Sequence, residues 1–465
     1  MVFSSSEFLF VFLPAVLLLY YNPVIKSRKF RNVFLFLASI AFYAYGEPVF
    51  VFLMLAAILL TWLLGLSFRK WPGRRKLLLS VGLLLHISLL FVFKYASFFF
   101  RQVGLLIKKD LNVQISLPIG ISFFTFQLMS YLIDVYRNKA KAQKNPVCLG
   151  LYTALFPQLI AGPIVRYTDI EYEIENRKET KEGITEGTFR FVYGLAKKLL
   201  LANYLAVMAD NIFMLAEYSD ISVLTAWLGI AAYVLQLYFD FSGYSDMAIG
   251  LGRIFGFHIL ENFNYPYSAC SVTELWRKWH ISLSSWFKDY VYIPLGGNRC
   301  EKKLRIRNMF IVWLLTGIWH GANWTYIVWG LYFFLILLLE KETGFRPKSK
   351  WPAHLYVMAV FMAGFVFFRS DTISGAVRYL GAMFHLNSNP FSDYIFTSYL
   401  SGGWPFLCLG AVLSIPVFPL IRKKVYEKSD RLGAAAESVL VVVLFLLSIL
   451  TAVSSTYNPF IYFNF

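Results

Sequence analysis

The feature that most constrains this chain is its succession of long stretches that contain no Asp, Glu, Lys or Arg. A helix needs about 20 predominantly apolar residues to cross the hydrocarbon core of a bilayer. Such stretches recur along the whole chain, at residues 8–25, 32–46, 48–68, 77–93, 111–133, 145–165, 221–239, 308–339 (two passes), 351–368, 394–421 and 438–465. A shorter one, 199–209, joins residues 189–195 as one more. We therefore expect an all-α polytopic membrane protein with about 11–13 transmembrane or re-entrant helices.

The composition supports this class. Of the 465 residues, 58% are hydrophobic and 15% are charged, whereas soluble domains carry about 25% charged residues. The formal net charge of +17 comes from short basic clusters between the apolar runs, at residues 26–31, 69–76, 137–144, 299–307, 341–350 and 422–431. This is the pattern of cytoplasmic loops under the positive-inside rule. The charge thus indicates topology and membrane lipids as neighbours, with no nucleic-acid partner.

The same rule predicts an orientation and a domain organisation. With residues 26–31 in the cytoplasm, the N-terminus lies outside and His320 lies toward the outer half of the membrane. We expect one membrane-embedded domain, 1–465, with a core at 111–340 and peripheral spans at 351–465. Internal Pro and Gly make 145–165 a kinked or re-entrant segment, and residues 166–198, dense in both charge signs, predict a solvated loop with helical character.

A further helix is predicted to begin near Val272. The sequence Ser271-Val-Thr-Glu274 resembles a capping box. From there an apolar stripe at spacings of three and four residues runs to Tyr290, and Pro294-Leu-Gly-Gly297 ends the helix. We expect this helix to lie in the membrane interface or to pack on the spans. His280 follows Trp276 by four residues, which predicts that both face the same side.

Two histidines are candidates for chemistry. His320 lies within the uncharged run 308–339, and an ionisable side chain at such depth is costly and marks a functional site by default. His280 precedes it in Trp276-Arg-Lys-Trp-His280. A neutral imidazole suits proton transfer from an alcohol at neutral pH. For both, the alternative is a buried histidine that only hydrogen-bonds a backbone carbonyl.

The other polar signals point away from metals and covalent catalysis. The four cysteines are scattered, which predicts neither a disulfide framework nor a metal site. No Gly-x-Ser-x-Gly motif or Gly-rich phosphate loop occurs in the sequence. Direct attack of a hydroxyl on a thioester, with histidine as general base, fits what is present. Among the remaining histidines, His86 is expected to be hydrogen-bonded or interface-facing and His354 and His385 to face solvent or headgroups, and His258 gives no specific signal.

Several motifs together resemble the membrane-bound O-acyltransferase family, in the branch of alginate and other polysaccharide O-acetyltransferases. They are ISFFTFQ (121–127), YLIDVY (131–136), FPQLIAGPIVR (156–166), QLYFDFSGYSD (236–246), WRKWHISLSSW (276–286), YIPLGGNR (292–299) and LTGIWHGAN (315–323). The resemblance covers roughly residues 3–340, and the combination is far more specific than any one motif.

The resemblance implies helices in a ring around a central funnel or tunnel, with His320 as the principal catalytic histidine and His280 as the second. Its substrate tunnel would be lined by Trp319, Asn323, Trp279, Trp276, Arg277 and Asp240. It implies no bound cofactor, and an acyl donor that reaches the site from the cytoplasm as acetyl-coenzyme A or an acyl carrier protein thioester. The implied partners outside are a polysaccharide acceptor and a serine-hydrolase-like acetyltransferase that completes delivery. The implied location is the bacterial cytoplasmic (inner) membrane.

Two other functions remain open from the sequence. The first is D-alanyl transfer in teichoic acid modification, which the resemblance implies on the same scaffold with a carrier-protein donor. The second is a glycan or lipid exporter without chemistry of its own. An exporter would keep its activity when the histidines are replaced, and an inverted-repeat design would show paired broken helices in two halves of the chain.

Overall fold

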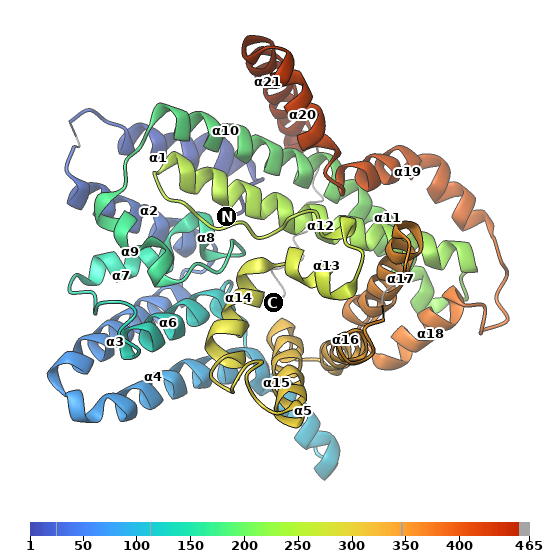
Figure 1. Cartoon of the computed structure of the whole chain (residues 1–465), viewed down its shortest axis with the longest axis horizontal. Coiled ribbons are helices and arrows are strands. Elements are labelled where there is room, and N and C mark those ends of the chain that lie inside the picture. Colours follow the sequence, from blue (N-terminus) through green and yellow to red (C-terminus); the bar gives the residue numbers. More distant parts are fainter. Residues whose placement is uncertain (25, 112, 346, 455–465) are drawn as a thin grey trace. The chain divides into compact units, whose positions relative to one another are not determined.

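The computed structural model describes residues 1–24, 26–111, 113–345 and 347–454. Within these ranges every regular element is a helix (Figure 1), which confirms the all-α class. Eight helical stretches are long and apolar enough to cross a membrane, and two shorter apolar helices, Phe8–Tyr20 and Ile121–Tyr136, accompany them. The chain is thus a multi-pass membrane protein by length and composition, and the ring around a tunnel stays a prediction.

The helices follow one another with short connections. In chain order they are α1 (Leu13–Tyr20), α2 (Arg28–Gly46), α3 (Phe50–Lys70), α4 (Arg75–Leu90), α5 (Ala96–Ile107), α6 (Ile121–Tyr136), α7 (Pro146–Ala154), α8 (Phe156–Leu159), α9 (Tyr167–Asn176), α10 (Lys181–Ala196), α11 (Asn203–Tyr218), α12 (Val223–Ile254), α13 (Val272–Lys278), α14 (Ile281–Phe287), α15 (Lys302–His320), α16 (Trp324–Thr343), α17 (Lys350–Arg369), α18 (Ile373–Met383), α19 (Tyr394–Leu413), α20 (Val417–Lys428) and α21 (Asp430–Ser454).

Short π-helical segments interrupt several of these helices. They are η1 (Phe8–Phe12), η3 (Phe91–Tyr95), η4 (Lys197–Ala202) and η6 (Lys288–Tyr292). Such π turns are rare overall, but those that occur are often found at functional sites.

The described chain forms two compact units. One consists of Met1–Phe191 with Tyr244–Leu260, and the other of Val192–Gly243 with the described residues from Glu261 onwards. The prediction of one domain for 1–465 remains a prediction.

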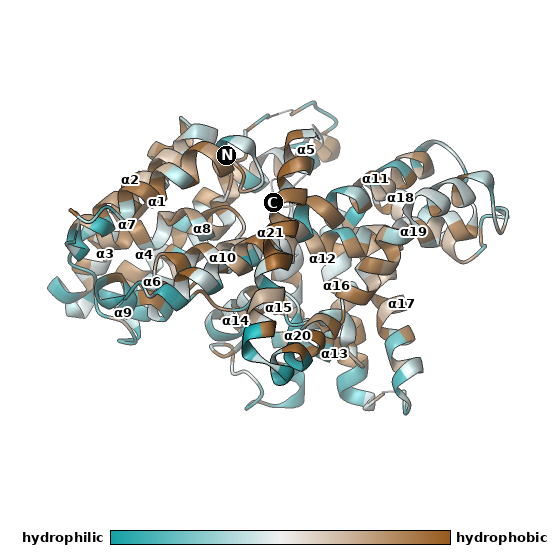
Figure 2. Cartoon of the chain, turned by 90° about the horizontal axis from the view of Figure 1, so that it is seen from above, coloured by the Kyte–Doolittle hydropathy of each residue, from teal (hydrophilic) through white to brown (hydrophobic). Residues whose placement is uncertain are grey.

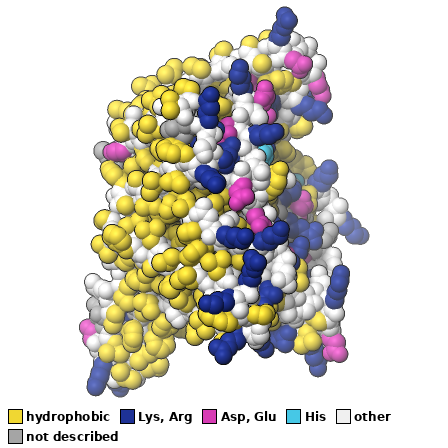
Figure 3. All heavy atoms as spheres, turned by 90° about the vertical axis from the view of Figure 1, so that its left-hand side faces the viewer, with side chains coloured by type: hydrophobic (Ala, Val, Ile, Leu, Met, Phe, Trp, Pro, Cys, Tyr) yellow, Lys and Arg dark blue, Asp and Glu magenta, His cyan; other side chains and the backbone are white. Residues whose placement is uncertain are grey.

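Surface hydropathy agrees with a bilayer environment. Hydrophobic residues dominate the long helices, whereas hydrophilic ones gather in connections, in α9 and in α20 (Figure 2). On the face shown in Figure 3, hydrophobic side chains cover a broad area, and most Lys and Arg side chains collect beside that area rather than within it. Exposed Leu, Val and Phe residues on α3 and α4 contribute apolar surface of this kind, which a membrane would cover.

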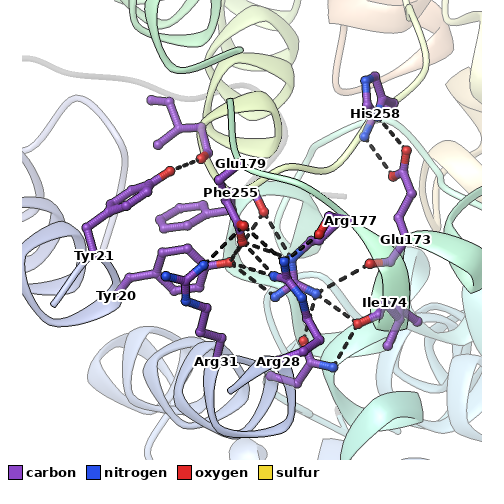
Figure 4. Close-up of polar contacts among 12 residues, drawn as sticks. Tyr20, Tyr21, Arg28, Arg31, Glu173, Ile174, Arg177, Glu179, Phe255 and His258 are labelled. Carbon is purple, nitrogen blue, oxygen red and sulfur yellow. Dashed lines mark hydrogen bonds and ion pairs between the residues drawn. The ribbon is translucent and has the colours of Figure 1, made fainter. Parts of the chain in front are cut away.

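In the first unit a buried ionic cluster ties α1 and α2 to the connection between α9 and α10 (Figure 4). The carboxylate of Glu179 lies 2.6 Å from Nη1 of Arg28 and 3.1 Å from Nη1 of Arg31, and it accepts a hydrogen bond from the Tyr20 hydroxyl. Arg177, whose side chain is fully buried, lies beside them. Burial raises the pKa of Glu179, but the hydrogen bonds from Arg28 and Tyr20 outweigh it and lower that pKa to about 2.

Glycines allow α10 and α12 to pack backbone to backbone. In the first unit, a Cβ atom on Gly250 would lie 2.5 Å from the carbonyl oxygen of Gly187. In the second unit, a Cβ on Gly243 would lie 2.8 Å from the carbonyl oxygen of Gly194. Real Cβ atoms do not approach a carbonyl oxygen so closely, so only glycine fits at these contacts. Small residues at helix contacts are the usual means of close approach in membranes.

Two ion pairs join the same helices. Arg190 Nη2 lies 2.8 Å from Asp246 Oδ1 in the first unit. Lys198 Nζ, in η4, lies 2.6 Å from Asp240 Oδ1 in the second, with both side chains almost completely buried. Because charges inside a membrane protein are costly unless paired, these pairs explain how Arg190 and Lys198 are accommodated within a largely apolar segment.

Two predicted segments differ from the structure. Helix α6 begins only at Ile121, so the run 111–133 is not one span; Pro118 and Gly120, whose φ is +75°, precede the helix and prevent an earlier start. The segment 145–165 is broken between α7 and α8 as predicted, and its re-entry into the membrane stays a prediction.

The predicted solvated loop 166–198 is wrong in its second half. A helix begins at Lys181 and continues through η4 and α11 to Tyr218 as one candidate span, and the pairs described above neutralise two of its charges, Arg190 and Lys198. This confirms that 189–195 and 199–209 belong to one span. At the other end of the chain, α21 accounts for 438–454, and the remainder of the predicted run 438–465 lies outside the described residues.

Candidate active site

The candidate site lies in the second unit and begins with the α15–α16 hairpin. The predicted turn at Gly321-Ala-Asn323 is confirmed, with α15 ending at His320 and α16 beginning at Trp324. The two helices approach closely because a Cβ on Gly317 would lie 2.5 Å from the Tyr326 carbonyl oxygen. The hairpin therefore holds the last residue of α15 firmly against the first turns of α16.

His320 is enclosed by aromatic rings. Its side chain is buried, with ring centroids 5.0 Å from Trp319, 4.9 Å from Trp329 of α16 and 5.0 Å from Phe368 of α17. An enclosure of this kind limits the access of water, and a neutral imidazole in such a place can accept a proton. Composition and position thus make His320 chemically suited to act as a base.

His280 reaches the same aromatic surface from another direction. Its ring lies 4.7 Å from that of Phe241 on α12 and 6.0 Å from that of Trp319, centroid to centroid. Since Trp319 also contacts His320, one indole joins the two histidines. The structure therefore brings together the two candidates that the sequence places 40 positions apart in the chain.

The predicted helix that carries His280 is confirmed at its start and wrong in its middle. Ser271 caps α13 by accepting a hydrogen bond from the backbone N–H of Glu274. The helix ends at Lys278, and α14 begins at Ile281 after a break in which His280 has φ +43°. His280 is consequently not on one helix face with Trp276, because the helical hydrogen bonding is interrupted between them.

A buried carboxylate fixes the start of α13. Glu340, near the end of α16, accepts hydrogen bonds from the backbone N–H groups of Val272 (2.7 Å) and Thr273 (2.9 Å) and from the Thr273 hydroxyl (2.7 Å). Two otherwise unpaired helix N–H groups are thereby satisfied by a negative charge, which is favourable at a helix N-terminus. The helix that leads to His280 is thus attached to the one that packs against His320.

The remaining predicted tunnel residues have the following surroundings. Trp279 is buried against Phe263 and Phe361, and Trp276 packs edge to face on Trp313 and Trp329. Asn323 caps α16 and donates to the Asp371 carbonyl, Arg277 is exposed, and Asp240 pairs with Lys198. A tunnel lining by these residues stays a prediction.

The other histidines are placed elsewhere. His86 is buried, with Nε2 2.9 Å from the Thr61 hydroxyl, as expected, and His385 is exposed, as expected. His354 differs from the prediction, because it is half-buried and its Nδ1 bonds the carbonyl of Ala269. His258 contacts the carboxylate of Glu173.

Sequence reasoning missed Trp329, Phe368, Glu340 and Asn262. A signal existed for Glu340, since it is the first charged residue after a long uncharged run. Asn262 carried none, because it precedes His280 by 18 positions in a stretch with no helical pattern.

In this helical membrane protein two imidazoles contact one indole, an arrangement that is compatible with a membrane-embedded acyltransferase. The chain belongs to the membrane-bound O-acyltransferase family, whose model matches residues 37–370. It is accordingly an O-acyltransferase.

Curated relatives agree with the family. A probable alginate O-acetylase of Pseudomonas putida is 38% identical over the whole of both chains. A peptidoglycan O-acetyltransferase of Helicobacter pylori is 34% identical over 83% of this chain and 80% of its own length. A teichoic acid D-alanyltransferase of Bacillus subtilis is 28% identical over 52% of this chain and 65% of its own.

Proposed function

We propose that this protein moves an acetyl group from a cytoplasmic thioester across the membrane to hydroxyls of a cell-surface polysaccharide, or to an extracytoplasmic relay transferase. The single observation that carries the proposal is the enclosure of His320 by aromatic rings, with His280 at the same indole. Support for acetyl comes from full-length similarity to a probable alginate O-acetylase. We place the protein in the bacterial cytoplasmic membrane, where a cytoplasmic donor and an external acceptor meet.

His320 acts as the general base in this proposal. The acceptor hydroxyl oxygen attacks the thioester carbonyl carbon while His320 takes the hydroxyl proton. A C–O bond forms, the C–S bond breaks, and the departing thiolate receives the proton from the imidazolium. His280 orients one of the substrates. Acetyl-coenzyme A or an acyl carrier protein supplies the thioester, and a serine-hydrolase-like partner outside completes delivery where transfer is relayed.

The test is base-labile acetate on the surface polysaccharide of the producing cell. We expect acetate to be lost in the deletion strain and to fall roughly 10²–10⁴-fold with His320→Ala, the range for removal of a general base. His385→Asn is the matched control, because this histidine is exposed and outside the site, and it should keep wild-type acetate. Expression and membrane insertion are compared for each variant.

The result also separates the alternatives. Wild-type acetate in cells that carry well-inserted His320→Ala would remove the general base from the proposal. Acetate unchanged in both the deletion and His320→Ala, with loss of D-alanine esters instead, would select D-alanyl transfer. Glycan export that is lost on deletion but survives His320→Ala would select an exporter.

A further inference from the structure

The break between α13 and α14 is made by one residue outside both helices, Asn262. Its backbone carbonyl accepts the N–H of Ile281 at 2.9 Å. Its side-chain Oδ1 accepts the N–H of Ser282 at 3.2 Å and the hydroxyl of Ser282 at 2.9 Å. Asn262 is completely buried. These bonds replace the helical ones at the start of α14, so the break is a built feature of the fold.

His280 lies inside this break in an unusual backbone conformation. Its φ of +43° falls in the left-handed region, which non-glycine residues rarely adopt and which persists only where the surroundings hold it. The neighbouring segment also contributes, since the N–H of Asn264 bonds the carbonyl of Lys278 on the other side of the break. The position of the imidazole is therefore determined by residues 262–264 rather than by a helix face.

The same Oδ1 atom also determines where His280 carries its proton. The backbone N–H of Ser282 can only donate, so the Asn262 atom that faces it is the amide oxygen and not the nitrogen. This oxygen lies 3.0 Å from Nδ1 of His280. Because an amide oxygen can only accept, Nδ1 must donate. In a neutral imidazole Nε2 then bears the lone pair.

We infer that Asn262 is a positioning residue that holds His280 as the Nδ1–H tautomer and presents Nε2 as a hydrogen-bond acceptor to the hydroxyl-bearing acceptor substrate. The inference rests on the proposed function and narrows the role of His280 in it. A ring whose Nε2 is unprotonated accepts a hydrogen bond from a hydroxyl at that atom and cannot donate one from it to the acyl carbonyl. A sugar carries neighbouring hydroxyls, so His280 binds one while His320 deprotonates another.

The first test reads the tautomer without activity. The ¹⁵N solid-state NMR spectrum of histidine-labelled full-length protein in lipid vesicles separates protonated from unprotonated ring nitrogens. Loss of a pair of signals in His280→Ala assigns those of His280. We expect a protonated Nδ1 and an unprotonated Nε2 near neutral pH. An Nε2–H ring at His280 in the wild-type protein would overturn the inference, whatever the polysaccharide assay gives.

The second test compares substitutions at Asn262. Asn262→Asp keeps an oxygen opposite Nδ1 and should retain both the Nδ1–H signal and acetate transfer within a few-fold. Asn262→Leu removes the acceptor and should lower transfer roughly 10–100-fold, the range for a residue that orients a functional histidine. It should also remove the preference for Nδ1–H. The matched control, His385→Asn, changes an exposed histidine outside the site and should leave the His280 tautomer and transfer near wild type.

These outcomes separate the positioning role from a merely structural one. Loss of transfer in Asn262→Leu with the wild-type tautomer retained would mean that Asn262 supports only the break, and would overturn the inference. If Asn262→Leu fails to insert into the membrane, the inference is tested by the tautomer of His280 in the wild-type spectrum and by the tautomer and acetate transfer of Asn262→Asp. If the His280→Ala variant transfers acetate normally and the wild-type protein shows the Nδ1–H tautomer at His280, the proposed role of His280 fails and the tautomer assignment stands.

Discussion

The buried ion pair between Lys198 and Asp240 offers the sharpest test of the helix packing. Lys198 lies in the π segment η4 and Asp240 in α12. Their side chains are 4% and 2% exposed, and Nζ and Oδ1 are 2.6 Å apart. Replacing Lys198 by Met keeps an unbranched side chain that is one atom shorter and removes the charge. The carboxylate of Asp240 then loses its cation in a place that water does not reach.

The expected cost follows from this burial. Removing one partner of a buried pair destabilises by about 3–5 kcal/mol, because the remaining charge stays buried without compensation. Replacing both partners with apolar residues of similar size is close to neutral. We therefore expect Lys198→Met to lower the free energy of unfolding by about 3 kcal/mol or more. The double variant Lys198→Met/Asp240→Leu should recover to within about 1 kcal/mol of wild type.

The measurement is chemical unfolding of the purified protein in mixed micelles, analysed as a double-mutant cycle. Lys423→Met is the matched control. Lys423 pairs with Glu427 at 3.8 Å, with side chains 74% and 61% exposed, and its loss should cost less than about 0.5 kcal/mol. If Lys198→Met lowers the free energy of unfolding no more than this control does, the pair is not desolvated and the reasoning fails. Acetate transfer by a stable double variant would assign Asp240 to packing rather than to the tunnel.

Three further predictions concern other contacts. Gly243→Ala should destabilise by roughly 1–3 kcal/mol, because the added Cβ meets the Gly194 carbonyl oxygen at 2.8 Å; a wild-type unfolding midpoint would contradict this. Glu340→Ala should lower transfer more than Glu340→Gln, which keeps an oxygen acceptor for the Val272 N–H; equal acetate in both would exclude the capping role. Glu179 has a lowered pKa, about 2, so its stabilisation is complete above its unfolded pKa of about 4.3 and disappears as the pH falls through about 2; the difference in Tm between wild type and Glu179→Gln should narrow over that interval, and a constant difference would refute it.

Much of the fold could be predicted because membrane spans are encoded directly by local composition. An uncharged run such as 308–339 predicts a pair of apolar helices, and Gly321 and Asn323 indicate their turn, which the structure confirms. The start of α13 was predictable as well, because a cap depends only on Ser271 and the next three residues.

What could not be predicted depends on partners distant in sequence. The apolar stripe around His280 continues at helical spacing, and nothing local indicates a break. The interruption comes from Asn262, whose carbonyl and amide oxygens take the N–H groups that a helix would use. In the same way, the charges after Lys181 suggest a solvated loop until Arg190 and Lys198 are seen to pair with Asp246 and Asp240.

The two histidines are therefore held by different means, and this bears on how they can act. His320 is the last residue of α15, and α15 packs closely on α16 at Gly317. The position of His320 therefore follows from the packing of these two helices. His280 depends on one buried amide and on a backbone conformation that few residues adopt. A base that takes a proton need only be near the reacting hydroxyl in its neutral form. A ring that orients a substrate needs a defined tautomer, and the hydrogen bond from Nδ1 of His280 to the Asn262 amide oxygen specifies one.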